Sequence, residues 1–110
     1  MIKTYLFLIG AILCEVAGTM LLPISQNFTK IIPTAALSVF YLSAFYLLTF
    51  VMNKLPLAIV YATWSGLGIF TIAILSYIFF KQILSWQAVI GLFLIVIGVV
   101  LVNSFTSKVI

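Results

Sequence analysis

The chain has 110 residues, of which 66% are hydrophobic and 5% charged, and its mean hydropathy is +1.45. That composition excludes an ordinary soluble domain and makes lipid the expected solvent. The charged residues are five isolated lysines and one acid, so the net charge of +4 provides no basic patch for nucleic acid.

Taken in chain order, the apolar stretches are each close to the roughly 20 residues that a helical membrane crossing needs. The expected spans are residues 5–22, 32–52, 57–80 and 86–105. We therefore expect an all-α membrane protein in which residues 1–110 form a single domain of four transmembrane helices. Tyr5 and Asn103 lie near span boundaries, where such side chains often act as interface anchors.

The lysines give little orientation signal. With four spans, Lys3, Lys54 and Lys108 would share one side of the membrane, while Lys30 and Lys81 would share the other. The side that carries more lysine and arginine normally sets the orientation of a membrane protein. A distribution as even as this one therefore predicts insertion in both orientations, unless subtler cues fix one. Four thin helices enclose little space, so we expect an antiparallel homodimer.

Glu15 is the single acidic residue, and it lies inside the first apolar stretch. A carboxylate at such a place costs about 2.5–3.5 kcal/mol on insertion scales, and intramembrane ionisable groups are functional-site candidates by default. Residues three and four positions away share its helix face, and these include the small residues Gly18 and Thr19. Small residues alone would indicate helix packing, but beside Glu15 they predict room for a ligand.

Two aromatic stripes are expected to face this carboxylate. On the third span one helix face carries Tyr61, Trp64, Ser65 and Gly68. On the second span one face carries Tyr41 and Phe45. Aromatic faces attract organic cations, and buried Trp and Tyr polar atoms need partners, for which Glu15 is the natural acceptor. Core packing is the alternative for Tyr41 and Phe45.

Glycines on the last two spans suggest moving or closely packed helices. Gly66 and Gly68 in the third span predict a hinge or a close helix contact. Gly91 and Gly98 share one face of the fourth span, which otherwise carries aliphatic and aromatic residues. We therefore expect the fourth span to be an assembly helix, with Gly91 and Gly98 in the dimer contact.

The missing residue types restrict the chemistry further. The sequence has no histidine, arginine or aspartate, and it lacks a phosphate-binding glycine loop and a metal-ligand cluster. We therefore expect no enzyme, no metal and no cofactor. Transport by this chain would depend on an ion gradient.

The segment Ala11–Thr19, the motif at residues 61–68 (YATWSGLG) and the Gly91…Gly98 pair resemble the bacterial small multidrug resistance family. The resemblance implies an antiparallel, dual-topology dimer in the bacterial inner membrane that exchanges protons for organic cations. It also implies that Glu15 binds proton and substrate alternately and that Tyr61 and Trp64 line the pocket.

The resemblance further favours the branch that exports quaternary ammonium and other lipophilic cations. The guanidinium exporters typically carry a tryptophan where this chain has Gly18, and Tyr41 and Phe45 also resemble the quaternary-ammonium branch. Departures occur in the loops: typical members carry a lysine where this chain reads Leu22-Pro23, and residues 83–85 lack the usual acidic residue and arginine. A narrower guanidinium or polyamine exporter, and a non-transporting membrane subunit that needs a paired homologue, remain as alternatives.

Overall fold

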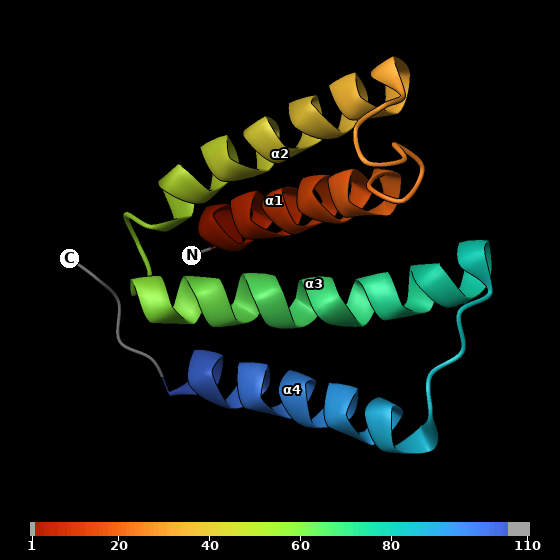
Figure 1. The fold of residues 1–110 in the computed structure, drawn as a ribbon. Coiled ribbons are helices and arrows are strands. Elements are labelled where there is room, and N and C mark those ends of the chain that lie inside the picture. Colours follow the sequence, from red (N-terminus) through yellow and green to blue (C-terminus); the bar gives the residue numbers. More distant parts are fainter. Residues whose placement is uncertain (1, 106–110) are drawn as a thin grey trace.

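The computed structural model describes residues 2–105 and contains four helices (Figure 1). They are α1 (Ile2–Leu21), α2 (Ile31–Val51), α3 (Leu57–Phe80) and α4 (Trp86–Ser104). Each is long and apolar enough to cross a membrane, and the described residues contain no strand. The predicted class, an all-α membrane protein of four helices, is confirmed. The expected single domain also includes residues 1 and 106–110, which lie outside the described residues.

Local chemistry explains where the helices end. α1 begins at Ile2, before the expected span, and includes Lys3 and Thr4. It ends at Leu21, two positions before Pro23. Lys81 ends α3 in a left-handed conformation (φ 55°), a common helix C-cap. Ser85 begins α4 by accepting a hydrogen bond from the amide of Ala88 at 3.2 Å, an N-cap that satisfies one free donor.

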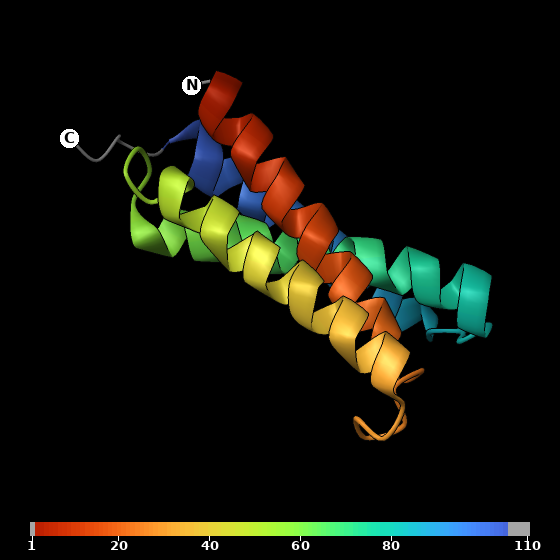
Figure 2. The same cartoon turned by 90° about the horizontal axis from the view of Figure 1, so that it is seen from above.

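The helices lie side by side in the order α2, α1, α3, α4 (Figure 1), since α1 packs on α2 and α3 while α4 packs on α3. Viewed from above, α1 and α2 cross over the layer formed by α3 and α4 (Figure 2). The core lies where α1, α2 and α3 meet and includes the buried residues Leu8, Ala11, Val16, Leu48 and Val60. This arrangement places α1, the helix of Glu15, at the centre of the bundle.

α4 is the most weakly covered helix. Val99 is its one buried residue, while large apolar side chains along its length are exposed. In a membrane these side chains contact lipid or another helix. The start of α1 and the α2–α3 connection lie at one end of the bundle, and the other two connections lie at the opposite end (Figure 1). Lys3 and Lys54 are therefore at one end and Lys30 and Lys81 at the other, whereas Lys108 lies outside the described residues.

Candidate functional site

Glu15 is held by a chain of hydroxyl groups. Thr19, one turn further along α1, donates a hydrogen bond to Oε1 of Glu15 at 3.0 Å. The hydroxyl oxygens of Thr19 and Tyr41 lie 2.8 Å apart. Because Thr19 has one hydroxyl hydrogen and directs it at Glu15, Tyr41 on α2 donates to Thr19. One carboxylate oxygen is thus satisfied from the α1–α2 side of the bundle.

Gly18 makes this hydroxyl chain possible. A side chain at position 18 would begin with a Cβ 3.1 Å from two ring carbons of Tyr41, which is closer than ordinary van der Waals contact. The ring of Tyr41 therefore lies directly against the backbone of α1. A bulky residue at position 18 would displace Tyr41 and with it the hydroxyl group that reaches Thr19.

Aromatic rings on α2 and α3 form a second part of the site, which we call the aromatic wall. The ring of Trp64 on α3 lies 6.0 Å from that of Phe45 on α2 and 5.9 Å from that of Tyr61, measured between centroids. Tyr61 is 64% exposed and Phe45 53% exposed, so both rings have free faces. Such faces attract cations through the ring quadrupole. The two predicted stripes therefore meet at Trp64.

The expected hydrogen bond from α3 to Glu15 is not formed, and that prediction was wrong. Oε2 of Glu15 and Nε1 of Trp64 are both buried without a hydrogen-bond partner. Oε2 instead lies against Gly68, where a Cβ would be 3.3 Å away, while the indole of Trp64 packs on the rings of Phe45 and Tyr61. A buried polar atom without a partner is costly. Here an unpaired acceptor, Oε2 of Glu15, and an unpaired donor, Nε1 of Trp64, belong to residues that line the same hollow.

Gly68 allows the carboxylate to approach α3. A Cβ built at position 68 would lie 3.3 Å from Oε2 of Glu15. Glu15, Tyr61, Trp64, Ser65 and Gly68 line a common hollow of about 320 Å³. Its lining also includes two residues that the sequence analysis missed, Ile69 and Ile72. They continue the same helical spacing beyond Ser65, which is the signal that could have identified them.

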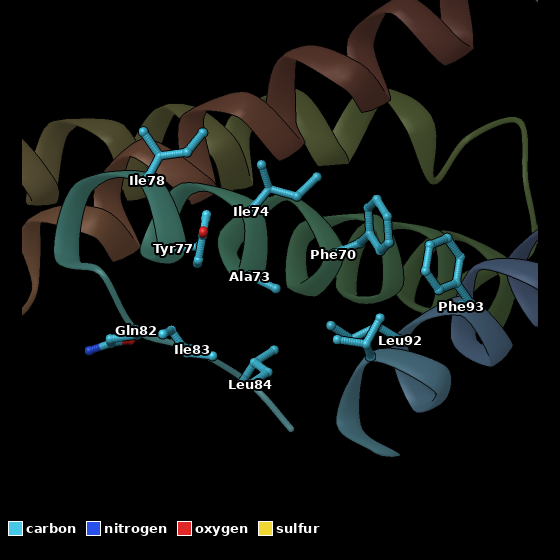
Figure 3. Close-up of a pocket in the computed structure, with 11 residues that line it drawn as sticks. Phe70, Ala73, Ile74, Tyr77, Ile78, Gln82, Ile83, Leu84, Leu92 and Phe93 are labelled. Carbon is cyan, nitrogen blue, oxygen red and sulfur yellow. The ribbon is translucent and has the colours of Figure 1, made fainter. Parts of the chain in front are cut away.

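A larger hollow, of about 540 Å³, lies elsewhere. It is formed by α3, the α3–α4 connection and α4, and Figure 3 shows Phe70, Ile74 and Tyr77 on one side with Leu92 and Phe93 on the other. Apart from Tyr77 and Gln82, its lining is apolar, and it contains no carboxylate. It therefore offers a cation no counter-charge, and we place the candidate site at Glu15.

The glycines of α3 and α4 fall into different surroundings. A Cβ at Gly66 would lie 2.6 Å from Cγ2 of Val99, so Gly66 gives α4 a close approach to α3 and does not face Glu15. Nothing lies within 4 Å of a Cβ at Gly91 or Gly98. That face of α4 is therefore open in the single chain.

Among residues 2–105 there is also no group of His, Cys, Asp and Glu side chains that could hold a metal ion.

Four membrane-length helices, with one half-buried carboxylate beside aromatic rings, describe a small integral membrane protein. The family model of the Small Multidrug Resistance proteins matches residues 3–95. The chain is 43% identical over 99 residues to the Multidrug transporter EmrE of Escherichia coli (strain K12), an alignment that covers 90% of each chain. The chain belongs to the small multidrug resistance family.

Two further relatives have names that specify a resistance. Identity is 44% over 101 residues with the Quaternary ammonium compound-resistance protein QacG of Staphylococcus sp. (strain ST94), covering 92% of this chain and 94% of that protein. It is 41% over 104 residues with QacH of Staphylococcus saprophyticus, covering 94% and 97%. These names describe transport or resistance to compounds and not an enzymatic reaction.

Proposed function

We propose that this protein exports lipophilic and quaternary ammonium cations in exchange for protons, by alternating access across a bacterial inner membrane. The observation that carries the proposal is Oε2 of Glu15, a buried acceptor without a partner beside a wall of aromatic rings. The names of the relatives, a multidrug transporter and quaternary ammonium resistance proteins, support the substrate class.

Competition for one oxygen would couple the two fluxes. Thr19 occupies Oε1, which leaves Oε2 to take either a proton or the positive charge of a cation. In a medium of low dielectric a bare carboxylate is costly, so the binding of either one stabilises the site. A proton that arrives on Oε2 removes the attraction that held the cation, and the cation leaves. No further titratable residue is needed.

The aromatic wall would set the breadth of substrates. Tyr61, Trp64 and Phe45 present ring faces, and dispersion and cation–π contacts place few demands on the shape of a cation. The hydroxyl groups of Thr19 and Tyr41 are already used by each other and by Glu15. Selection would then depend on positive charge and apolar surface, as lipophilic cations supply.

We further propose that two chains associate as an antiparallel homodimer. The even distribution of lysines between the two ends of the bundle supports insertion in both orientations. The exposed apolar surface of α4 and the open space beside Gly91 and Gly98 support α4 as the contact helix. Substrate sites at the interface of inverted repeats are known from larger transporters, and here two chains would take the place of the repeats. A hinge at Gly66 and Gly68 remains a prediction.

Gradient-driven uptake into liposomes tests this function. Purified protein is reconstituted, a proton gradient is imposed, and accumulation of tetraphenylphosphonium is measured for the wild type, Glu15→Gln and Cys14→Ala. Cys14 is the neighbouring residue on α1 and carries no charge, so it controls for local packing. We expect transport by the wild type and Cys14→Ala, and none by Glu15→Gln although it still inserts and dimerises.

The other outcomes separate the alternatives. Uptake of guanidinium or polyamines but not of tetraphenylphosphonium would identify a narrower exporter. If none of these cations is taken up until a homologous chain is co-reconstituted, the protein is a subunit of a paired transporter. Proton-driven uptake retained by Glu15→Gln would refute the role of the carboxylate.

A further inference from the structure

A second polar cluster, separate from the hydroxyl chain at Glu15, joins three helices at one end of the bundle. It consists of Tyr5 on α1, Thr63 on α3 and Asn103 on α4. Tyr5 donates its hydroxyl hydrogen to Oδ1 of Asn103 at 2.8 Å. Nδ2 of Asn103 donates to the hydroxyl oxygen of Thr63 at 2.7 Å and to the carbonyl of Val99 at 2.9 Å. We call these three side chains the Asn103 clamp.

Asn103 uses both of its amide hydrogens and its oxygen within the protein. Tyr5 and Asn103 were expected to anchor the protein at the membrane interface, but they bond to each other instead. Thr63 is buried, with 4% of its surface exposed. Polar side chains that hydrogen-bond across helices hold membrane helices together where apolar packing against lipid gives no preference.

The clamp is the polar connection between α4 and the helices of the candidate site. Among residues 2–105, the side-chain hydrogen bonds that join α4 to another helix are the two formed by Asn103. One partner, Tyr5, is on the helix of Glu15, and the other, Thr63, immediately precedes Trp64. A movement of α4 that keeps the clamp intact must therefore move the clamped ends of α1 and α3 with it.

The surroundings of the clamp allow it to open. All three of its side chains line a hollow of about 390 Å³, together with Val100 and Ser104 of α4. Elsewhere α4 packs on α3, and the close contact of Gly66 with Val99 lies next to the clamp. Tyr5 and Asn103 border this hollow and are only half-buried, so they have space into which they can rotate.

We propose that Asn103 is a positioning residue that locks α4 to α1 and α3 in this conformation, and that the lock must open for the site to change access. The inference rests on the proposed transport function. Tyr5 lies near the start of α1 and Asn103 near the end of α4, so the clamp lies at the end of the bundle where α1 begins. The α2–α3 connection lies at the same end (Figure 1).

In an antiparallel dimer whose subunits exchange conformations, one clamp opens as the other forms. Removing the clamp then destabilises both end states equally, and the free-energy barrier between them becomes lower. Interhelical hydrogen bonds in membranes average about 0.6 kcal/mol, so each lost bond should speed the exchange about threefold. Loss of both interhelical bonds should speed it about tenfold.

The experiment measures the rate of exchange between the two access states by NMR in lipid bicelles, beside tetraphenylphosphonium affinity at alkaline pH. Asn103→Leu removes both interhelical bonds, while Tyr5→Phe and Thr63→Val remove one each. Tyr77→Phe and Thr71→Val are matched controls. Among residues 2–105, Tyr77 is exposed and forms no hydrogen bond through its hydroxyl, and the hydroxyl of Thr71 bonds only within α3. The single-bond variants keep the test valid if Asn103→Leu does not fold.

We expect exchange about threefold faster in Tyr5→Phe and Thr63→Val and about tenfold faster in Asn103→Leu, with affinity within about twofold of the wild type. Wild-type exchange rates in all three variants would overturn the proposal. Weaker cation binding at an unchanged exchange rate would also overturn it, by making the cluster part of the binding site. Either failure leaves the effect of Glu15→Gln on uptake intact, so the two proposals fail separately.

Discussion

Replacing Gly66 by alanine would place a methyl carbon 2.6 Å from Cγ2 of Val99 and 3.1 Å from Cγ2 of Ile95. Ordinary van der Waals contact begins near 3.4 Å, so α3 and α4 would have to move apart. Overpacking of this kind costs about 1–3 kcal/mol. The higher helix propensity of alanine returns up to about 1 kcal/mol. We expect a net destabilisation of about 1–2 kcal/mol.

A second substitution tests whether this contact is the cause. Val99→Ala removes the methyl group that the new side chain meets, at the cost of a small void when made alone. In the double variant the two changes compensate, because the alanine at position 66 fills space that Val99 has vacated. We expect a favourable coupling of at least about 1 kcal/mol between the two substitutions.

Unfolding in mixed micelles, measured for the wild type, both single variants and the double variant, gives the coupling directly. Proton-driven uptake by the same four proteins then separates packing from hinge motion at Gly66. If Gly66 serves packing, uptake by the double variant recovers to the level of Val99→Ala. Additive stabilities, within about 0.5 kcal/mol, would refute the packing argument. Uptake that stays low in a stable double variant would favour a hinge.

Gly68→Ala should weaken tetraphenylphosphonium binding about fivefold, because the new Cβ displaces the carboxylate of Glu15 by a few tenths of an ångström while Thr19 still holds it. Titration calorimetry would measure the loss of affinity. Gly10→Ala is the control, since a Cβ there meets only the flexible end of Leu47 at the same 3.3 Å. Equal losses of affinity in the two variants would contradict the prediction. Leucine at Gly98 should reduce dimer formation in a crosslinking assay while leaving the fold of the single chain intact, since nothing lies within 4 Å of that position. An unchanged dimer fraction would remove Gly98 from the predicted contact.

The fold was predictable because each apolar stretch has the length of one membrane crossing and turn residues separate them. A helical period places Gly18 and Thr19 on the face of Glu15 and puts Tyr61, Trp64 and Ser65 on one stripe, and these assignments need only local geometry. That Tyr61, Trp64 and Ser65 share a hollow with Glu15 then follows from packing α1 against α3.

The hydrogen-bond partners were not predictable in the same way. Periodicity shows that Thr19 shares the face of Glu15, but not that its hydroxyl bonds to Oε1, nor that Oε2 and Nε1 of Trp64 each stay without a partner. The bond between Tyr5 and Asn103 joins the two ends of the chain, and no local spacing relates them. Both depend on how the helices are rotated against one another, which apolar composition leaves open because nearly every helix face is apolar.

Proton release on binding of a cation tests the central claim most directly. Tetraphenylphosphonium is added to detergent-purified protein in weakly buffered solution at several pH values, for the wild type and Glu15→Gln. If proton and cation compete for Glu15, the wild type releases protons on binding, the release disappears at alkaline pH where the carboxylate is already ionised, and Glu15→Gln releases none. Cation binding by the wild type without proton release at any pH, or equal release by Glu15→Gln, would contradict it.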